Sequence, residues 1–159
     1  MTYDAGLIVG KFCPLHAGHQ LLIDTALTWC DRLIIVSYTK PDFPGYDRAL
    51  RERWLRALYP GVTSLVVDDI WLAANQPDGL FSAVPHDDEP EDIHRRFTAW
   101  LCLQVLGETV DAVFTSESYG DGFAAVLTDW FRDHAGTSHT VTHVCVDPAR
   151  EQVPVSGTM

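Results

Sequence analysis

The 159-residue sequence predicts a single α/β domain, residues 1–159, built on a doubly wound parallel sheet of about five strands. Its apolar runs are rich in Val, Ile and Leu and do not alternate with polar residues, which is typical of strands buried on both faces. Amphipathic stretches separate these runs, and this alternation of strand and helix favours a parallel sheet with helices on both sides. The length suits one domain with its own core.

The expected elements follow the apolar pattern along the chain. Strands are expected at Ala5–Gly10, Leu33–Tyr38, Val62–Val67, Val110–Thr115 and Thr140–Val146. Helices, indicated by apolar residues at helical spacing, are expected at Gly18–Cys30, Asp47–Tyr59, Glu91–Leu106 and Gly122–His134. Pro60 and Gly61 give the second helix its stop signal.

The stretch Asp68–Pro90 combines prolines, glycines and several acidic residues, and it is predicted to be a long surface loop. A loop of this length in a compact domain is often functional, so we expect a substrate lid or a second substrate site there. Trp71 is the aromatic residue of interest within it.

The charge balance restricts the classes of partner. The chain carries 22 acidic and 11 basic residues, for a formal net charge of -11. Such a field repels phosphate backbones and excludes a general nucleic-acid binder. Any phosphate site must therefore be built locally, from backbone N–H groups, histidines and a few cations. No apolar run reaches the roughly 18 residues that span a bilayer, so no membrane partner and a cytoplasmic location are expected.

The segment GKFCPLHAGH, residues Gly10–His19, follows the first predicted strand and opens the next helix. Gly10 allows the backbone to pass close to a ligand. Gly18 lies at the helix start, where free N–H groups and the positive end of the helix dipole bind anions. His16 and His19 are three residues apart and can reach the same side of the first turn. This combination can hold a triphosphate and stabilise charge during phosphoryl or nucleotidyl transfer.

Two other interpretations of this turn stay open. The histidines could be incidental surface residues, or they could bind a metal together with Cys13. A P-loop is excluded, because the G-x-x-x-G-K spacing is one residue short and Phe12 occupies the Ser/Thr position. The remaining histidines, among them His94 and His143, have no sequence neighbours that suggest a site.

GKFCPLHAGH resembles the G-x-F-x-P-x-H-x-G-H signature of the nucleotidylyltransferase superfamily. It is most similar to the nicotinamide mononucleotide adenylyltransferase domain of the bacterial bifunctional adenylyltransferase/ribosylnicotinamide kinase. The segments that extend the resemblance, in the family's order, are Arg51–Leu55, Thr115–Glu117, Asp147–Arg150 and Val155–Thr158. The family's pattern continues to a basic residue about three positions after the last of these, beyond Met159.

The resemblance implies a Rossmann-like nucleotidyltransferase fold and a set of site residues. The catalytic residues would be His16, His19 and Lys11, with the histidines at the ATP phosphates and Lys11 as a nearby cation. The residues that would bind ATP are Gly10, Phe12, Gly18, Ser116, Arg150, Ser156 and Thr158.

The resemblance also implies the reaction, which is adenylyl transfer from ATP to nicotinamide mononucleotide, giving NAD and pyrophosphate. Mg²⁺ would arrive with the ATP phosphates, mostly through water and phosphate oxygens, and no protein metal ligand is expected. Trp71 is the candidate for stacking on the nicotinamide ring. Two alternatives remain: transfer to another phosphorylated acceptor, of the cytidylyl or pantetheine-phosphate type, and a module that senses ATP or NAD without turning it over. The oligomeric state is open, a homo-oligomer included.

Overall fold

The computed structural model describes residues 2–12, 17–117 and 120–146. It contains a five-stranded parallel sheet in the order β3-β2-β1-β4-β5, flanked by helices, which confirms the predicted α/β fold. The strands are β1 (Tyr3–Val9), β2 (Cys30–Tyr38), β3 (Thr63–Val67), β4 (Ala112–Thr115) and β5 (Thr142–Cys145). The helices are α1 (Ala17–Trp29), α2 (Arg48–Leu58), α3 (Asp69–Asn75), α4 (Glu91–Trp100) with the π-helical continuation η1 (Leu101–Val105), and α5 (Gly120–Ala135).

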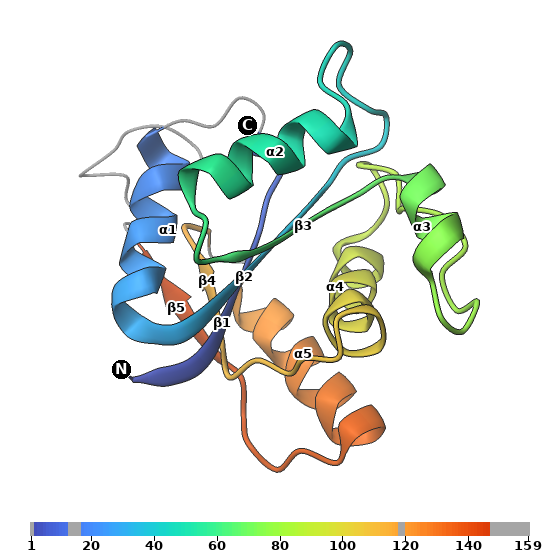
Figure 1. The fold of residues 1–159 in the computed structure, drawn as a ribbon. Helices are drawn as coiled ribbons and strands as arrows, with labels where there is room; N and C mark the ends of the chain where they lie inside the picture. The colour runs from blue at the N-terminus through green and yellow to red at the C-terminus, as the bar shows by residue number, and fades with distance from the viewer. Residues whose placement is uncertain (1, 13–16, 118–119, 147–159) are drawn as a thin grey trace.

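Helices cover both faces of the sheet. Side chains of α1 and α2, such as Ile23 and Leu55, form one core with Ile8 of β1. Side chains of α4 and α5, such as Trp100 and Leu127, form the other core, together with β1 and β2 residues of the opposite face. Figure 1 shows α1 and α2 on one side of the sheet and α4 and α5 on the other. Successive residues of a strand point to opposite faces, so a continuously apolar strand supplies both cores.

The side on which new strands are added to the sheet changes at β1. From β1 the chain first adds β2 and β3 on one side and then crosses over to add β4 and β5 on the other. The crevice at the carboxyl ends of β1 and its neighbours is therefore the topological switch point, where open α/β sheets bind their ligands. Gly10–Phe12, which follow β1, therefore lie at this crevice.

The segment Asp68–Pro90 differs from its prediction as one long surface loop. It begins with helix α3, whose N-cap Asp68 accepts a hydrogen bond from the Trp71 N–H at 2.7 Å. Leu72 and Val84 are buried, so the segment also contributes to the core. The acidic residues that indicated a loop have structural roles instead. Asp68 caps α3, and Asp69 accepts a hydrogen bond from the Val84 N–H at 2.7 Å, which holds the later part of the segment against the helix.

The other predicted helices and strands are present with small shifts at their ends. Helix Glu91–Leu106 is confirmed as α4 and η1, and Asp47 caps α2 by accepting from the Leu50 N–H at 2.8 Å. Within the part of the chain that the structure describes, no helix has both the length and the apolar character that a membrane span requires.

The two-core arrangement predicts which leucines stabilise the fold. Leu127 of α5 has no exposed surface, whereas Leu80 is 56% exposed. Leu127→Ala should lower the free energy of unfolding by about 2–5 kcal/mol, because it removes buried methyl groups and leaves a cavity. Leu80→Ala should change it by less than about 1 kcal/mol. Urea denaturation of both variants measures the two values, and equal losses would contradict the described core.

Candidate functional site

The turn after β1 is fixed to the end of β2 by backbone and side-chain hydrogen bonds. The Gly10 N–H donates to the Val36 carbonyl at 3.1 Å. The Ser37 hydroxyl donates to the Lys11 carbonyl at 2.9 Å. Phe12 has a φ of 53°, in the left-handed region that side-chain-bearing residues rarely adopt. The chain is thus held in an unusual conformation directly at the switch point.

The Phe12 ring occupies the space between Gly10 and His19. A Cβ on Gly10 would lie only 2.8 Å from the Phe12 Cζ atom, so the ring fills the position that any larger residue would need. On its other side the ring meets His19 edge to face, with centroids 4.8 Å apart and an interplanar angle of 70°. His19 has no exposed surface and Phe12 is 4% exposed. A phosphate therefore reaches the His19 ring only if its neighbours move.

Arg51 places a buried cation beneath the same turn. It is 3% exposed, and one of its guanidinium nitrogens donates to the Ser37 hydroxyl at 3.3 Å. The guanidinium also lies over the Phe43 ring, 5.8 Å from its centroid. Since Ser37 in turn bonds the Lys11 carbonyl, Arg51 supports the turn from the β2–α2 side. Arginine cannot lose its charge in a protein, so this cation is permanent in a strongly acidic chain.

Lys11 is paired with Asp87, a residue that the sequence did not single out. Its Nζ lies 3.1 Å from an Asp87 carboxylate oxygen. The same carboxylate accepts from the Thr39 hydroxyl at 3.1 Å and from the Lys40 N–H at 3.2 Å. Burial raises the pKa of Asp87, but the bonds from Lys11, Lys40 and Thr39 outweigh it, so the pKa lies below its usual value. Asp87 stays ionised and connects the turn after β1 to the segment after β2.

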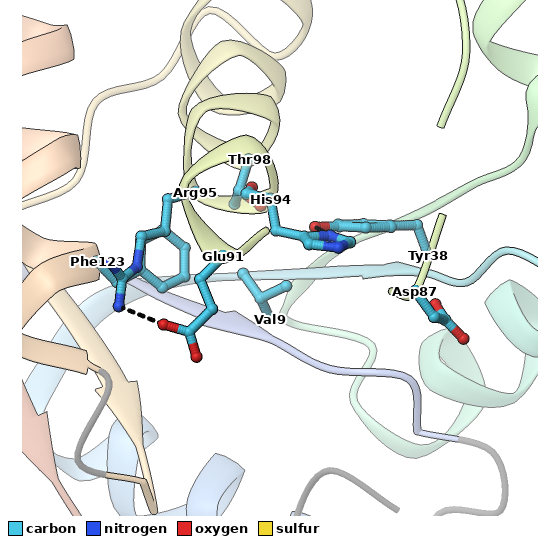
Figure 2. A pocket seen from close by; sticks show the side chains of 8 residues that line it. All are labelled: Val9, Tyr38, Asp87, Glu91, His94, Arg95, Thr98 and Phe123. Carbon is cyan, nitrogen blue, oxygen red and sulfur yellow. Dashed lines mark hydrogen bonds and ion pairs between the residues drawn. The ribbon is translucent and has the colours of Figure 1, made fainter. Parts of the chain in front are cut away.

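A cavity of about 300 Å³ opens between the carboxyl ends of β1 and β2 and the helices α4 and α5. Its lining residues are Val9, Tyr38, Asp87, Glu91, His94, Arg95, Thr98 and Phe123. In Figure 2 the Tyr38 and His94 rings lie at one end and the Arg95–Glu91 ion pair at the other. The ring planes differ by 12°, and the Tyr38 hydroxyl lies 2.9 Å from His94 Nδ1. The Arg95 guanidinium lies 3.1 Å from the Glu91 carboxylate.

The structure brings together some of the predicted site residues. Gly10, Lys11, Phe12, Gly18 and His19 all lie at the carboxyl end of β1 or the first turns of α1. Ser116 follows β4 at the same edge of the sheet. The predicted residues His16, Arg150, Ser156 and Thr158 lie outside the described residues.

Trp71 lies on α3, where it is partly buried against the core, and it is not among the residues that line the cavity. The cavity residues Tyr38, Asp87 and His94 were not identified from the sequence. They lie on a strand end, a loop and a helix, and Tyr38 is far from the other two in the sequence, so no local motif contains all of them. Within residues 2–12, 17–117 and 120–146, no group of three or more His, Cys, Asp or Glu side chains could hold a metal ion.

No protein-family model and no curated protein matches this sequence. Solved structures do match. The NadR protein in complex with NR has a TM-score of 0.55 at 18% identity, over 92% of this chain and 37% of that one. A bifunctional NMN adenylyltransferase/ADP ribose pyrophosphatase from Francisella tularensis, complexed with AMP and a manganese ion, has a TM-score of 0.52 at 16% identity, over 91% and 37% of the two chains.

The lipopolysaccharide core biosynthesis protein from Thermoplasma volcanium has a TM-score of 0.50 at 11% identity, over 89% of this chain and 96% of that one. At these identities the likeness shows the fold alone, and this chain shares the α/β fold of these structures. It spans just over a third of the length of the first two of these structures, 37% in each case.

The packing around Gly10 predicts a sensitive backbone position. Gly10→Ala should displace the Phe12 ring from His19 and lower the free energy of unfolding by about 1–3 kcal/mol, the usual cost of overpacking. Gly61→Ala is the matched control, since no atom lies within 4 Å of a Cβ there. Denaturation measures the stabilities, and the NMR shifts of the His19 ring report its displacement. Equal stability of the two variants would contradict this geometry.

The hydrogen bonds of Asp87 predict a pH dependence. Because the pKa of Asp87 is lower in the folded chain, its contribution to stability is present above the unfolded value of about 3.9 and is lost as the pH falls through the folded value. Wild type should therefore be more stable than Asp87→Asn at pH 7, and the difference should shrink below about pH 3.9. Asp88→Asn, at a side chain that is 85% exposed, should change stability at pH 7 by less than about 0.5 kcal/mol. An Asp87→Asn protein as stable as wild type at pH 7 would refute the role of this carboxylate.

Proposed function

We propose that this chain transfers the adenylyl group of ATP to nicotinamide mononucleotide, giving NAD and pyrophosphate. The observation that carries the proposal is the arrangement at the switch point. The Gly10–Phe12 turn, the start of α1 with His19, and a cavity of about 300 Å³ meet at the carboxyl end of β1. The fold is shared with an NMN adenylyltransferase and with NadR, which has been solved with NR and with NAD and AMP-PNP.

The proposed reaction needs no nucleophile from the protein. An oxygen of the acceptor phosphate attacks the α-phosphorus of ATP and forms a P–O bond, while the bond from that phosphorus to the bridging oxygen breaks. The electron pair leaves with pyrophosphate. Catalysis then rests on positioning and on stabilising the charge of the phosphoryl oxygens. The N–H groups at the start of α1 and the Lys11 ammonium are suited to the phosphates, and His19 would donate to a phosphoryl oxygen.

Lys11 lies between the phosphate side and the cavity. Its side chain is 35% exposed and is held by Asp87, which itself lines the cavity. An ammonium at this position can contact an acceptor phosphate that sits between the two regions. Its partner Asp87 keeps the long side chain oriented before the substrates bind, which lowers the entropy cost of that contact.

The cavity suits a small flat ring with positive charge. Its volume of about 300 Å³ is at the lower end of the range for small-molecule sites. Tyr38 and Phe123 supply aromatic surface, and Asp87 and Glu91 supply negative charge. The pyridinium ring of nicotinamide mononucleotide is cationic and its amide is neutral, whereas nicotinic acid mononucleotide adds a carboxylate. Glu91 is paired with Arg95 and Asp87 with Lys11, so the preference for the nicotinamide form rests on the Asp87 carboxylate, which is left to the ring once Lys11 contacts the acceptor phosphate. Trp71 as a stacking residue stays a prediction.

Mg²⁺ belongs to the proposed reaction as a companion of ATP. The described residues offer no cluster of three or more acidic, His or Cys side chains, so the fit is that of an ion held mainly by phosphate oxygens and water. When bound, the ion would neutralise charge on the phosphates. The chain's own contribution is the Lys11 cation and the donors at the start of α1.

The burial of His19 favours one competing function. A histidine with no exposed surface, packed under Phe12, is compatible with a module that binds a nucleotide without turning it over. Transfer to another phosphorylated acceptor would use the same turn and a different occupant of the cavity. Turnover measurements separate these functions.

The test incubates the full chain with ATP, Mg²⁺ and nicotinamide mononucleotide, and follows NAD with a coupled dehydrogenase. Steady NAD formation that stops on addition of EDTA supports the proposal. Nucleotide binding without NAD, but with pyrophosphate released in a screen of other acceptors, would replace the acceptor. Binding with no pyrophosphate from any acceptor would favour the sensor.

His19 provides the prediction for the catalytic step. His19→Ala should lower kcat by on the order of 10²–10³, the scale for one preorganised transition-state donor. His134→Ala, at an exposed position near the end of α5, is the control and should leave kcat unchanged. Because His19 is buried, circular dichroism must show that the variant is folded, and His19→Asn offers a smaller change. A folded His19 variant with wild-type turnover would refute this assignment.

A further inference from the structure

A partly buried polar cluster joins β4, α5 and β5 beside the proposed site. His143 lies on β5, yet its side chain is only 7% exposed. Its Nδ1 lies 2.9 Å from a carboxylate oxygen of Asp121, and its Nε2 lies 2.6 Å from the Thr115 hydroxyl.

The Thr115 hydroxyl uses all of its hydrogen-bonding capacity within this cluster. It donates to the Glu117 carbonyl at 2.8 Å and accepts from the Glu117 N–H at 3.2 Å. The ring nitrogen Nε2 of His143 is its third hydrogen-bonding partner, and a hydroxyl has one proton and two lone pairs. The hydroxyl thus fixes both polar groups of the Glu117 backbone, and His143 fixes the hydroxyl.

The start of α5 is built around the imidazole ring. A Cβ on Gly120 would lie 2.1 Å from His143 Nε2, so only glycine lets the helix begin this close to the ring. The Val146 N–H donates to the Thr115 carbonyl at 2.7 Å, which fastens the end of β5 to the end of β4. Asp121, in the first turn of α5, holds the opposite edge of the imidazole.

The cluster lies at the edge of the sheet where the nucleotide is proposed to bind. β1 and β4 each continue for two residues beyond the Leu7–Val113 pair, so the two strands end at the same level. The Thr115–Glu117 turn therefore faces the same crevice as the Gly10–Phe12 turn, on the other side of the switch point. Hydrogen bonds are directional, so a chain of hydrogen bonds fixes the orientation of a turn in a way that apolar packing does not. The chain that runs from Asp121 through His143 to Thr115 is such a relay.

We propose that Thr115, His143 and Asp121 are positioning residues, which hold the Ser116–Glu117 backbone in the orientation that contacts ATP. The proposal rests on the proposed adenylyl-transfer site for the identity of the nucleotide. Asp121 orients the imidazole, the imidazole orients the Thr115 hydroxyl, and the hydroxyl fixes the turn. The relay acts on ATP more than on the acceptor cavity, since most of the cavity lining comes from β1, β2 and α4 and only Phe123 comes from α5.

The experiment measures ATP binding by calorimetry and, separately, the KM values for ATP and for nicotinamide mononucleotide. Thr115→Val keeps the shape of the buried side chain and removes the hydroxyl. It should weaken ATP binding about tenfold, the equivalent of one hydrogen bond, and leave the acceptor KM within about twofold. Thr115→Ser restores the hydroxyl and should restore binding. Thr142→Val, at an exposed position of β5, is the matched control and should bind ATP like wild type.

Asp121→Asn is the second variant, because its side chain is 90% exposed and the change does not threaten folding. It should weaken ATP binding by about threefold, since it keeps an oxygen but loses the charge. Binding by Thr115→Val and Asp121→Asn equal to wild type would overturn the proposal, as would equal changes in the ATP and acceptor KM values. Wild-type binding of ATP without NAD formation would reject the proposed function alone, since the calorimetric comparison still tests the relay. Failure of the wild-type chain to bind ATP would reject both.

Discussion

The position of β1 at the centre of the sheet is the constraint on which the rest of the structure depends. It pairs with β2 on one side and β4 on the other, and it supplies apolar side chains to both cores. Because the order of the strands reverses at this point, helices from opposite layers diverge beyond its carboxyl end. The turn that follows has few ways to fold, since hydrogen bonds to Val36 and Ser37 already fix its backbone.

An acidic protein needs local cations to bind an anion such as the proposed nucleotide, and two lie at this site. Lys11 and Arg51 are held next to the turn by Asp87 and Ser37, respectively. Ion pairs at partly exposed positions add little to stability, so the value of the Lys11 contact is chiefly that it places a cation. The buried Arg51 is harder to explain as a stabilising feature, because a buried charge is costly unless it is well bonded. Its position beneath the turn makes electrostatic sense if an anion binds above.

The sequence predicted the sheet because each strand is a continuous apolar run, and it predicted the end of α2 because Pro60 and Gly61 follow it. It missed α3, where Asp68 serves as a cap and was interpreted as a loop residue. The turn after β1 could be predicted because its residues are consecutive. The cavity could not, because Tyr38 and His94 are 56 residues apart and meet only through the packing of α4 on the sheet. The partners of His143 could not be predicted either, because they lie on β4 and α5, far from His143 in the sequence.

Ion pairs connect the two parts of the site, and they bear on the proposed choice of acceptor. Lys11 of the turn after β1 pairs with Asp87, which lines the cavity, and Glu91 pairs there with Arg95. If nicotinamide mononucleotide binds with its phosphate at the turn and its ring in the cavity, the Lys11 ammonium can contact the phosphate while the cationic ring compensates the Asp87 carboxylate. An acceptor that has a phosphate but no cationic group would leave the Asp87 carboxylate without a compensating charge. The pairing of Lys11 with Asp87 would therefore favour a dipolar acceptor over one that carries negative charge alone.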